Sequence, residues 1–79
     1  MTPKAQPQRE APERRAIVIN GEPAETHAAT LADLVASLGH AESQVATALN
    51  GEFVPRAARA ATPLGAGDKV EIVAPRQGG

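Results

Sequence analysis

Side chains that commonly carry catalysis are present, but their spacing assembles no catalytic centre. Glu52, Asp68 and Glu71 lie beside expected turns or on a solvent-facing strand side, without the pairing that general acid–base catalysis requires. His27 and His40 flank an expected helix and have no ligand-type partner three or four residues away. The sequence has no cysteine, which excludes a disulfide, a thiolate zinc site and a cysteine nucleophile. We therefore expect a protein that is not an enzyme and holds no metal.

A different reactive group is the carboxylate at the end of the stretch VEIVAPRQGG. Gly78 and Gly79 have no Cβ, so a partner enzyme could thread them through a narrow channel and reach the terminal carbonyl. A free carboxylate is a poor electrophile, but adenylation would activate it toward a sulfur or amine nucleophile. The alternative is an ordinary frayed terminus. We expect Gly79 to be the reacting residue and Gly78 to provide clearance.

Length and composition bound the remaining possibilities. The 79 residues are enough for one small domain, and aromatic residues make up only 1% of them. The formal net charge is −1 with both signs interspersed, which gives no electrostatic case for nucleic acid or an anionic membrane. No apolar run approaches the roughly 20 residues of a membrane span, and the N-terminal stretch does not resemble a secretory signal. The expected location is the cytoplasm.

The chain divides into three expected segments. Residues 1–14 contain three prolines, several charges and no large apolar residue after the initiator, so they cannot bury enough surface to offset the entropy of ordering. We expect a disordered tail there, a folded domain over 15–75 and a flexible diglycine tail over 76–79.

Two Asn-Gly pairs separate short extended stretches. Both residues of such a pair tolerate positive φ, which makes it a strong signal for a tight hairpin turn. The expected strands are 17–19 and 22–27 around Asn20-Gly21, and 45–49 and 53–54 around Asn50-Gly51. Pro23 restricts its strand to a sheet edge or a strand start.

Between the hairpins, TLADLVASLGH predicts a helix of about two and a half turns. Thr30 can cap its start, with Asp33 three residues on, and Gly39 can end it in the left-handed conformation. One apolar face follows helical spacing and contains Leu31, Leu34, Val35 and Leu38.

The last strand, KVEIVA, alternates with Val70 and Ile72 on one face. A connection precedes it, in which Leu64 is expected to enter the core. The first and last strands are the most hydrophobic, so they should be central, adjacent and parallel. The predicted fold is α+β: a mixed sheet packed on one helix, in the order strand-strand-helix-strand-strand-strand.

Several stretches together resemble the ubiquitin-like sulfur carriers of the ThiS/MoaD family, and most closely the ThiS type of thiamine biosynthesis. The residues that carry the resemblance are IVING, LNGEFVPR at 49–56, TPLGAGDKVEIV at 62–73 and QGG at 77–79. The resemblance covers about residues 16–79 and implies a β-grasp fold. The long N-terminal tail departs from compact members of the family.

The resemblance also implies a mechanism. An E1-like adenylyltransferase of the ThiF type would use ATP and magnesium to adenylate Gly79. A persulfide donor would then supply sulfur to form a thiocarboxylate. The charged carrier would dock on thiazole synthase (ThiG type) and give up its sulfur. The chain itself binds no cofactor and acts as a protein cosubstrate in this scheme.

Docking on such partners requires an accessible surface. Strand alternation places Val18, Ala48, Phe53 and Val73 on the sheet face opposite the helix, and an apolar patch there would suit a partner site. Scattered surface apolar residues are the alternative. Arg76 could add a charged contact near the tail, whereas no physical role for Arg56 follows from the sequence.

Three other functions remain open at this point. The small subunit of molybdopterin synthase has the same thiocarboxylate chemistry, although NGEFVPR favours the ThiS type. A ubiquitin-like modifier joined to lysine amines is a second. A non-catalytic β-grasp interaction module is a third, but it gives no reason for the terminal diglycine.

Overall fold

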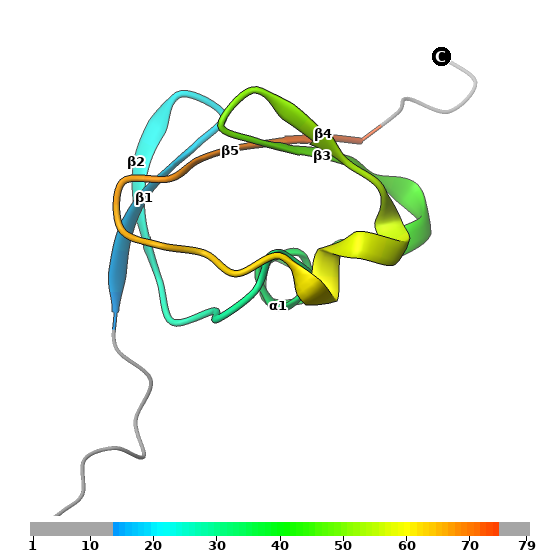
Figure 1. The fold of residues 1–79 in the computed structure, drawn as a ribbon, viewed down its shortest axis with the longest axis horizontal. Helices are drawn as coiled ribbons and strands as arrows, with labels where there is room; N and C mark the ends of the chain where they lie inside the picture. Colours follow the sequence, from blue (N-terminus) through cyan, green and yellow to red (C-terminus); the bar gives the residue numbers. More distant parts are fainter. Residues whose placement is uncertain (1–13, 75–79) are drawn as a thin grey trace, which may run out of the picture.

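The computed structural model describes residues 14–74. Its five strands form one mixed sheet in the order β2-β1-β5-β3-β4, and α1 and the 3-10 helix η3 lie on one side of it (Figure 1). The strands are β1 (Arg15–Ile19), β2 (Glu22–Thr26), β3 (Ala46–Leu49), β4 (Glu52–Val54) and β5 (Lys69–Val73). The helical elements are α1 (Leu31–Ser37), η2 (Glu42–Gln44) and η3 (Arg56–Ala61). The predicted α+β class and element order, and with them the β-grasp fold, are confirmed.

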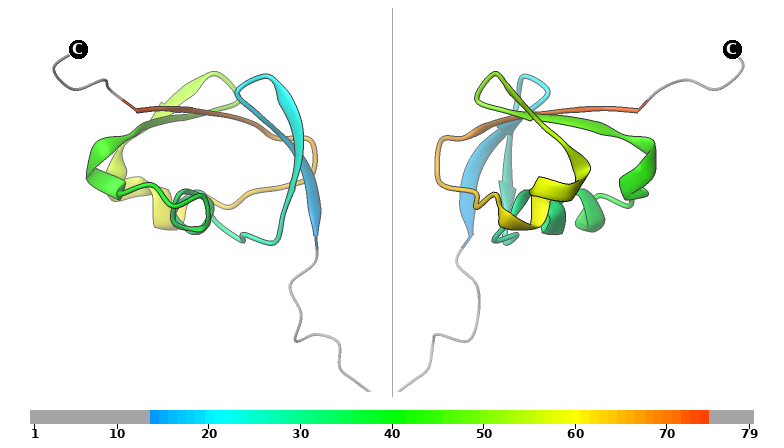
Figure 2. Two further views of the ribbon diagram at one scale, coloured as in Figure 1. Left: turned by 180° about the vertical axis from the view of Figure 1, so that it is seen from behind. Right: turned by 45° about the vertical axis from the view of Figure 1, so that its right-hand side comes forward.

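The central strands pair as expected. β1 and β5 are parallel, with Val18 opposite Lys69 and Ile19 opposite Val70. β2 and β4 occupy the two edges, so Pro23 lies on an edge strand, where its missing N–H costs no ladder bond. A parallel pair needs a crossover connection. The helical segments between β1 and β5 provide it, because they cross one face of the sheet before the chain enters β5 (Figure 2).

Both Asn-Gly turns form with the backbone conformation that their residue types favour. Asn20 and Asn50 have φ of 51° and 53°, and the following glycines have φ of 85° and 87°. Antiparallel strands flank each turn, β1 with β2 and β3 with β4. The two predicted hairpins are therefore confirmed.

Helix α1 begins at the predicted cap and is shorter than expected. The backbone N–H of Asp33 donates to Thr30 Oγ1 at 3.1 Å, and Gly39 has a φ of 83°. The helix has seven residues, about two turns. It ends at Ser37, so Leu38 lies in the C-cap and is 45% exposed. The expectation that Leu38 belongs to the buried face is wrong, because the chain turns away before that position can pack.

A small aliphatic core fills the space between the sheet and the helices. Leu64 enters this core, as predicted from the connection before β5. The eight buried hydrophobic residues are Ile17, Leu31, Leu34, Val35, Val45, Leu64, Val70 and Ile72. With so few aromatic side chains in the sequence, branched aliphatic packing supplies nearly all of the buried apolar surface.

Several elements differ from their predicted bounds. The expected strand over 45–49 begins one residue later, at Ala46, and the strand expected over 22–27 ends at Thr26. The strands expected over 17–19 and 53–54 begin earlier, at Arg15 and Glu52, and the stretch read as a plain connection contains η3. The division into tail, domain and diglycine segments stays a prediction. Residues 1–13 and 75–79, which include Arg76, Gly78 and Gly79, lie outside the described residues.

Candidate functional site

The sheet face opposite α1 carries two large exposed hydrophobic side chains. Phe53 is 70% exposed and Val73 is 61% exposed, although both belong to strands. Their strand neighbours Val54 and Ile72 point the other way, toward the core. The alternation of side chains along a strand therefore places Phe53 and Val73 on the outer face, as the sequence predicted.

The strand register brings these side chains together. Phe53 lies opposite Ala48 across β3 and β4, and Val73 lies opposite Ala46 across β3 and β5. Ala46 and Ala48 are two residues apart on β3, so they share the outer face and link Phe53 on one side of β3 to Val73 on the other. We call these four residues, Ala46, Ala48, Phe53 and Val73, the outer apolar patch. The sequence prediction did not include Ala46, although the same alternation of side chains along the strand places it on the outer face.

Val18 lies on the same face but apart from this patch. On β5 its neighbour is Lys69, and the next outward residue, Glu71, lies opposite Ala48. Two charged side chains thus stand between Val18 and the patch, and Val18 is itself half-buried. The structure assembles three of the four predicted apolar docking residues and separates the fourth.

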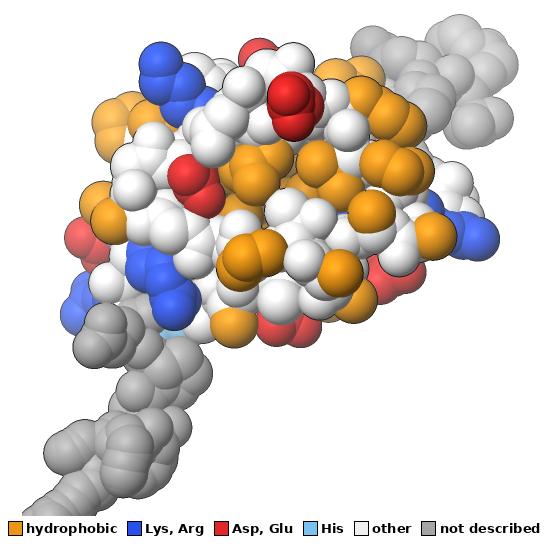
Figure 3. Space-filling view, viewed as in Figure 1, with side chains coloured by type: hydrophobic (Ala, Val, Ile, Leu, Met, Phe, Trp, Pro, Cys, Tyr) orange, Lys and Arg blue, Asp and Glu red, His pale blue; other side chains and the backbone are white. Residues whose placement is uncertain are grey.

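The patch adjoins the point where β5 ends. Val73 is the last residue of β5, and Ala74 is the last described residue. Figure 3 shows hydrophobic side chains gathered beside the place where the described part of the chain stops. The outer apolar patch therefore borders the end of the described chain.

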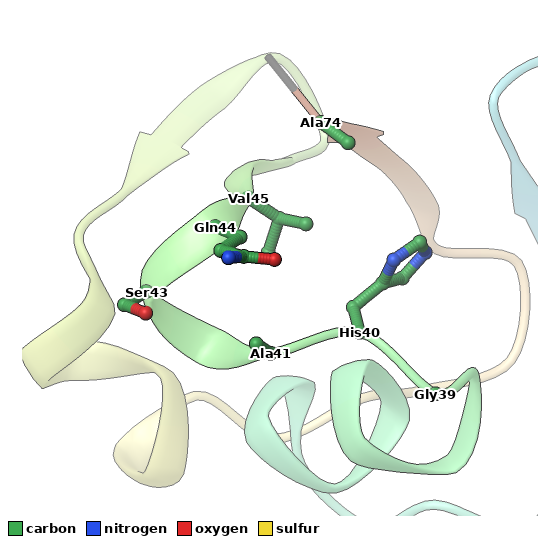
Figure 4. Close-up of a pocket in the computed structure, with 7 residues that line it drawn as sticks. All are labelled: Gly39, His40, Ala41, Ser43, Gln44, Val45 and Ala74. Atoms are coloured by element: carbon green, nitrogen blue, oxygen red, sulfur yellow. The ribbon is translucent and has the colours of Figure 1, made fainter. Parts of the chain in front are cut away.

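A cavity of about 260 Å³ lies on the other side of Ala74. The side chains of His40, Gln44 and Val45 point into it, and Ala74 borders it from the end of β5 (Figure 4). Its remaining lining residues are Gly39, Ala41 and Ser43. His40 has no acidic residue beside it in this lining, so the cavity offers no acid–base pair.

A second, more open cavity of about 560 Å³ lies between the end of β2 and α1. Glu25, His27 and Asp33 contribute to its lining. Within residues 14–74, no group of three potential metal-binding side chains comes together, here or elsewhere. The same residues contain no helix long and apolar enough to cross a membrane.

Sequence reasoning missed one buried charged residue. Arg59, in η3, is 2% exposed, and its guanidinium donates three hydrogen bonds. The acceptors are Thr47 Oγ1 at 3.0 Å, the Glu42 carbonyl oxygen at 2.9 Å and the Val45 carbonyl oxygen at 2.7 Å. These bonds tie η3 to η2 and to the start of β3, which carries half of the outer apolar patch. Arg56, at the start of η3, is exposed.

Comparison with known proteins agrees with this architecture. The profile of the ThiS family matches residues 8–79. The crystal structure of a thiamine biosynthesis protein (ThiS) from Geobacter metallireducens is 32% identical, with a TM-score of 0.68, over 81% of this chain and 99% of that one. The solution structure of a thiamine biosynthesis protein from the same organism is also 32% identical, with a TM-score of 0.69, over 81% and 87%. No curated protein matched significantly. By its sequence profile and its fold alike, the chain belongs to the ThiS family.

Proposed function

We propose that this protein is a sulfur carrier of thiamine biosynthesis whose reacting group is the carboxylate of Gly79. Family membership supports the carrier role, and the two similar structures are named as thiamine biosynthesis proteins. The observation that carries the proposal furthest is the outer apolar patch, because it adjoins the end of the strand that leads to Gly78 and Gly79. In this proposal the folded domain binds the partner enzymes, and the carboxylate at the end of the chain reacts.

The proposed reaction proceeds in three steps. The Gly79 carboxylate attacks the α-phosphate of ATP, pyrophosphate leaves and an acyl adenylate forms. A persulfide sulfur then attacks the acyl carbon, AMP leaves, and a thiol cleaves the resulting sulfur–sulfur bond to release the thiocarboxylate. The thiocarboxylate sulfur finally bonds to the intermediate held by thiazole synthase, its bond to the acyl carbon breaks, and an oxygen takes its place so that the Gly79 carboxylate is restored. Adenylation overcomes the poor electrophilicity of a carboxylate, because AMP is a far better leaving group than oxide.

The catalytic groups for these steps belong to partner proteins in this proposal. ATP and magnesium are bound by an adenylyltransferase of the ThiF type, the persulfide by a donor protein, and the acceptor by a thiazole synthase of the ThiG type. The chain is a cosubstrate, and a cytoplasmic location follows from the need for ATP.

Docking is assigned to the outer apolar patch. Phe53 is the largest exposed side chain on this face, and aromatic residues are favoured at the centres of protein interfaces. Glu71 lies opposite Ala48 at the border of the patch, and Lys69 lies two residues before it on the same strand face; both would orient the partner through charge. Arg76 is proposed as a further contact near the tail, and Val18 as a peripheral one.

The test is intact-mass spectrometry of the full chain purified from cells limited for thiamine. We expect a fraction of the protein to gain the mass difference of sulfur replacing oxygen, and deletion of Gly79 to abolish this species. Phe53→Ser is the matched variant: it keeps the carboxylate but loses a docking side chain, so it should lower the fraction of chains that carry the thiocarboxylate and leave the mass difference between the two forms unchanged. An unmodified mass under thiamine limitation would contradict the proposal.

A further inference from the structure

Strand β1 ends before its parallel neighbour β5 does. Its last residue is Ile19, while β5 continues to Val73. The backbone N–H of Asn20 still donates to the Val70 carbonyl oxygen at 2.8 Å, and there the chain turns away with a positive φ at Asn20. The parallel ladder would therefore stop at Val70, leaving the end of β5 without a neighbour on its β1 side.

The side chain of Asn20 continues the ladder. Its Oδ1 accepts from the Ile72 backbone N–H at 2.9 Å, and its Nδ2 donates to the Ile72 carbonyl oxygen at 3.1 Å. A primary carboxamide directs its oxygen and one N–H to the same side, so this single side chain satisfies both backbone polar groups of Ile72, which in a longer β1 would pair with two successive peptides. Both backbone polar groups of Ile72 are directed to this side of β5, so β3 cannot replace the pairing.

Asn50 provides a matched contact at the other end of β5. Its Oδ1 accepts from the Lys69 backbone N–H at 2.9 Å, and its Nδ2 donates to Asp68 Oδ1 at 3.1 Å. The two asparagines have nearly the same φ and each precedes a glycine. Their side chains differ in what they hold: Asn50 holds the first residue of β5, and Asn20 holds the residue just before Val73 and Ala74.

We infer that Asn20 is a positioning residue that fixes the end of β5 and, through it, the place at which the reactive tail leaves the fold. Ile72 is the last residue of β5 with its side chain in the core, and Val73, which follows it, belongs to the outer apolar patch. Because Asn20 holds both the N–H and the C=O of Ile72, the end of β5 and the outer apolar patch stay in one arrangement. The expected effect on thiocarboxylate formation rests on the proposed function, whereas the contact between Asn20 and Ile72 does not.

The experiment compares Asn20→Gly with Asn50→Gly in the full chain. Glycine accepts positive φ, so each variant keeps its turn and loses only the side-chain amide, at a similar cost in unfolded-chain entropy. Backbone amide exchange is followed residue by residue by NMR. We expect Asn20→Gly to speed exchange at Ile72 by at least about tenfold beyond any global change, because two hydrogen bonds are lost there. Asn50→Gly should do the same at Lys69 and leave Ile72 unchanged.

A measurement on the unsubstituted protein keeps the inference testable even if the Asn20→Gly variant does not fold. A scalar coupling across the hydrogen bond, from the Ile72 amide nitrogen to the Asn20 side-chain carbonyl carbon, reports the contact directly. Its absence, or equal protection of Ile72 in Asn20→Gly and the unsubstituted chain, would overturn the inference.

The functional readout uses a ThiF-type adenylyltransferase. Because Gly79 is unchanged, Asn20→Gly should raise KM for the chain several-fold with little change in kcat, and Asn50→Gly should change neither beyond twofold. Equal effects of the two substitutions would refute the positioning role. If the unsubstituted chain is not adenylated, the proposed function is refuted. The amide-exchange result would then still test whether Asn20 holds Ile72.

Discussion

Replacing Arg59 by methionine tests whether a buried cation stabilises this small fold. The guanidinium donates to Thr47, Glu42 and Val45, and among residues 14–74 no acidic side chain forms an ion pair with it. Methionine keeps a long unbranched side chain, so the substitution removes the hydrogen bonds while filling much of the same space.

The expected loss can be worked out contact by contact. The Val45 carbonyl accepts a buried hydrogen bond, and a buried acceptor left without a partner costs about 1 to 3 kcal/mol. The Glu42 carbonyl is partly buried and can recover water, so we assign it about 0.5 to 1 kcal/mol. Thr47 still donates to the Val54 carbonyl, which limits its loss to about 0.5 kcal/mol. Removing a desolvated charge returns part of this sum. We expect a net loss of about 3 kcal/mol, a large share of the stability of a small domain.

The assay is urea unfolding followed by circular dichroism, since the chain has no tryptophan or tyrosine for fluorescence. A loss of this size corresponds to a fall in Tm of roughly 12 to 24 °C. Arg56→Met is the matched control, because Arg56 lies in the same 3-10 helix and is exposed, and its effect should stay within about 0.5 kcal/mol. Equal stabilities of the two variants would refute the reasoning.

Three further predictions use the same unfolding assay or a binding assay. Thr30→Ala should cost about 1 kcal/mol by removing the cap on the Asp33 N–H, and a loss below about 0.3 kcal/mol would contradict the cap. Leu34→Ala should cost about 3 kcal/mol, while Leu38→Ala should cost under about 1 kcal/mol, because only the first is buried; similar costs would place Leu38 in the core after all. Phe53→Ser should leave the free energy of unfolding within about 0.5 kcal/mol and weaken binding to a ThiF-type partner at least about tenfold. Unchanged binding, measured by calorimetry, would remove Phe53 from the docking surface.

Local sequence signals predicted the turns, the helix start and the strand faces correctly. Asn-Gly pairs, a threonine cap and strict alternation act over a few residues, so their outcome depends little on the rest of the chain. The same alternation placed Phe53 and Val73 on the outer face. It could not show that charged side chains separate Val18 from them, because that depends on the register between β1, β5 and β3.

Local patterns and the family-like stretches therefore predicted the five strands and the main helix, their order, the two central strands and the membership of the ThiS/MoaD group, but neither 3-10 helix. The polar side chains that join distant segments by hydrogen bonds became evident only in the folded structure. Arg59 reads as an ordinary surface cation until η3 packs it against carbonyls from η2 and β3. Asn20 reads as a turn residue until β5 brings Ile72, 52 positions later, beside its amide. Such contacts join residues far apart in the chain, and no local pattern records which of them the folded sheet will place together.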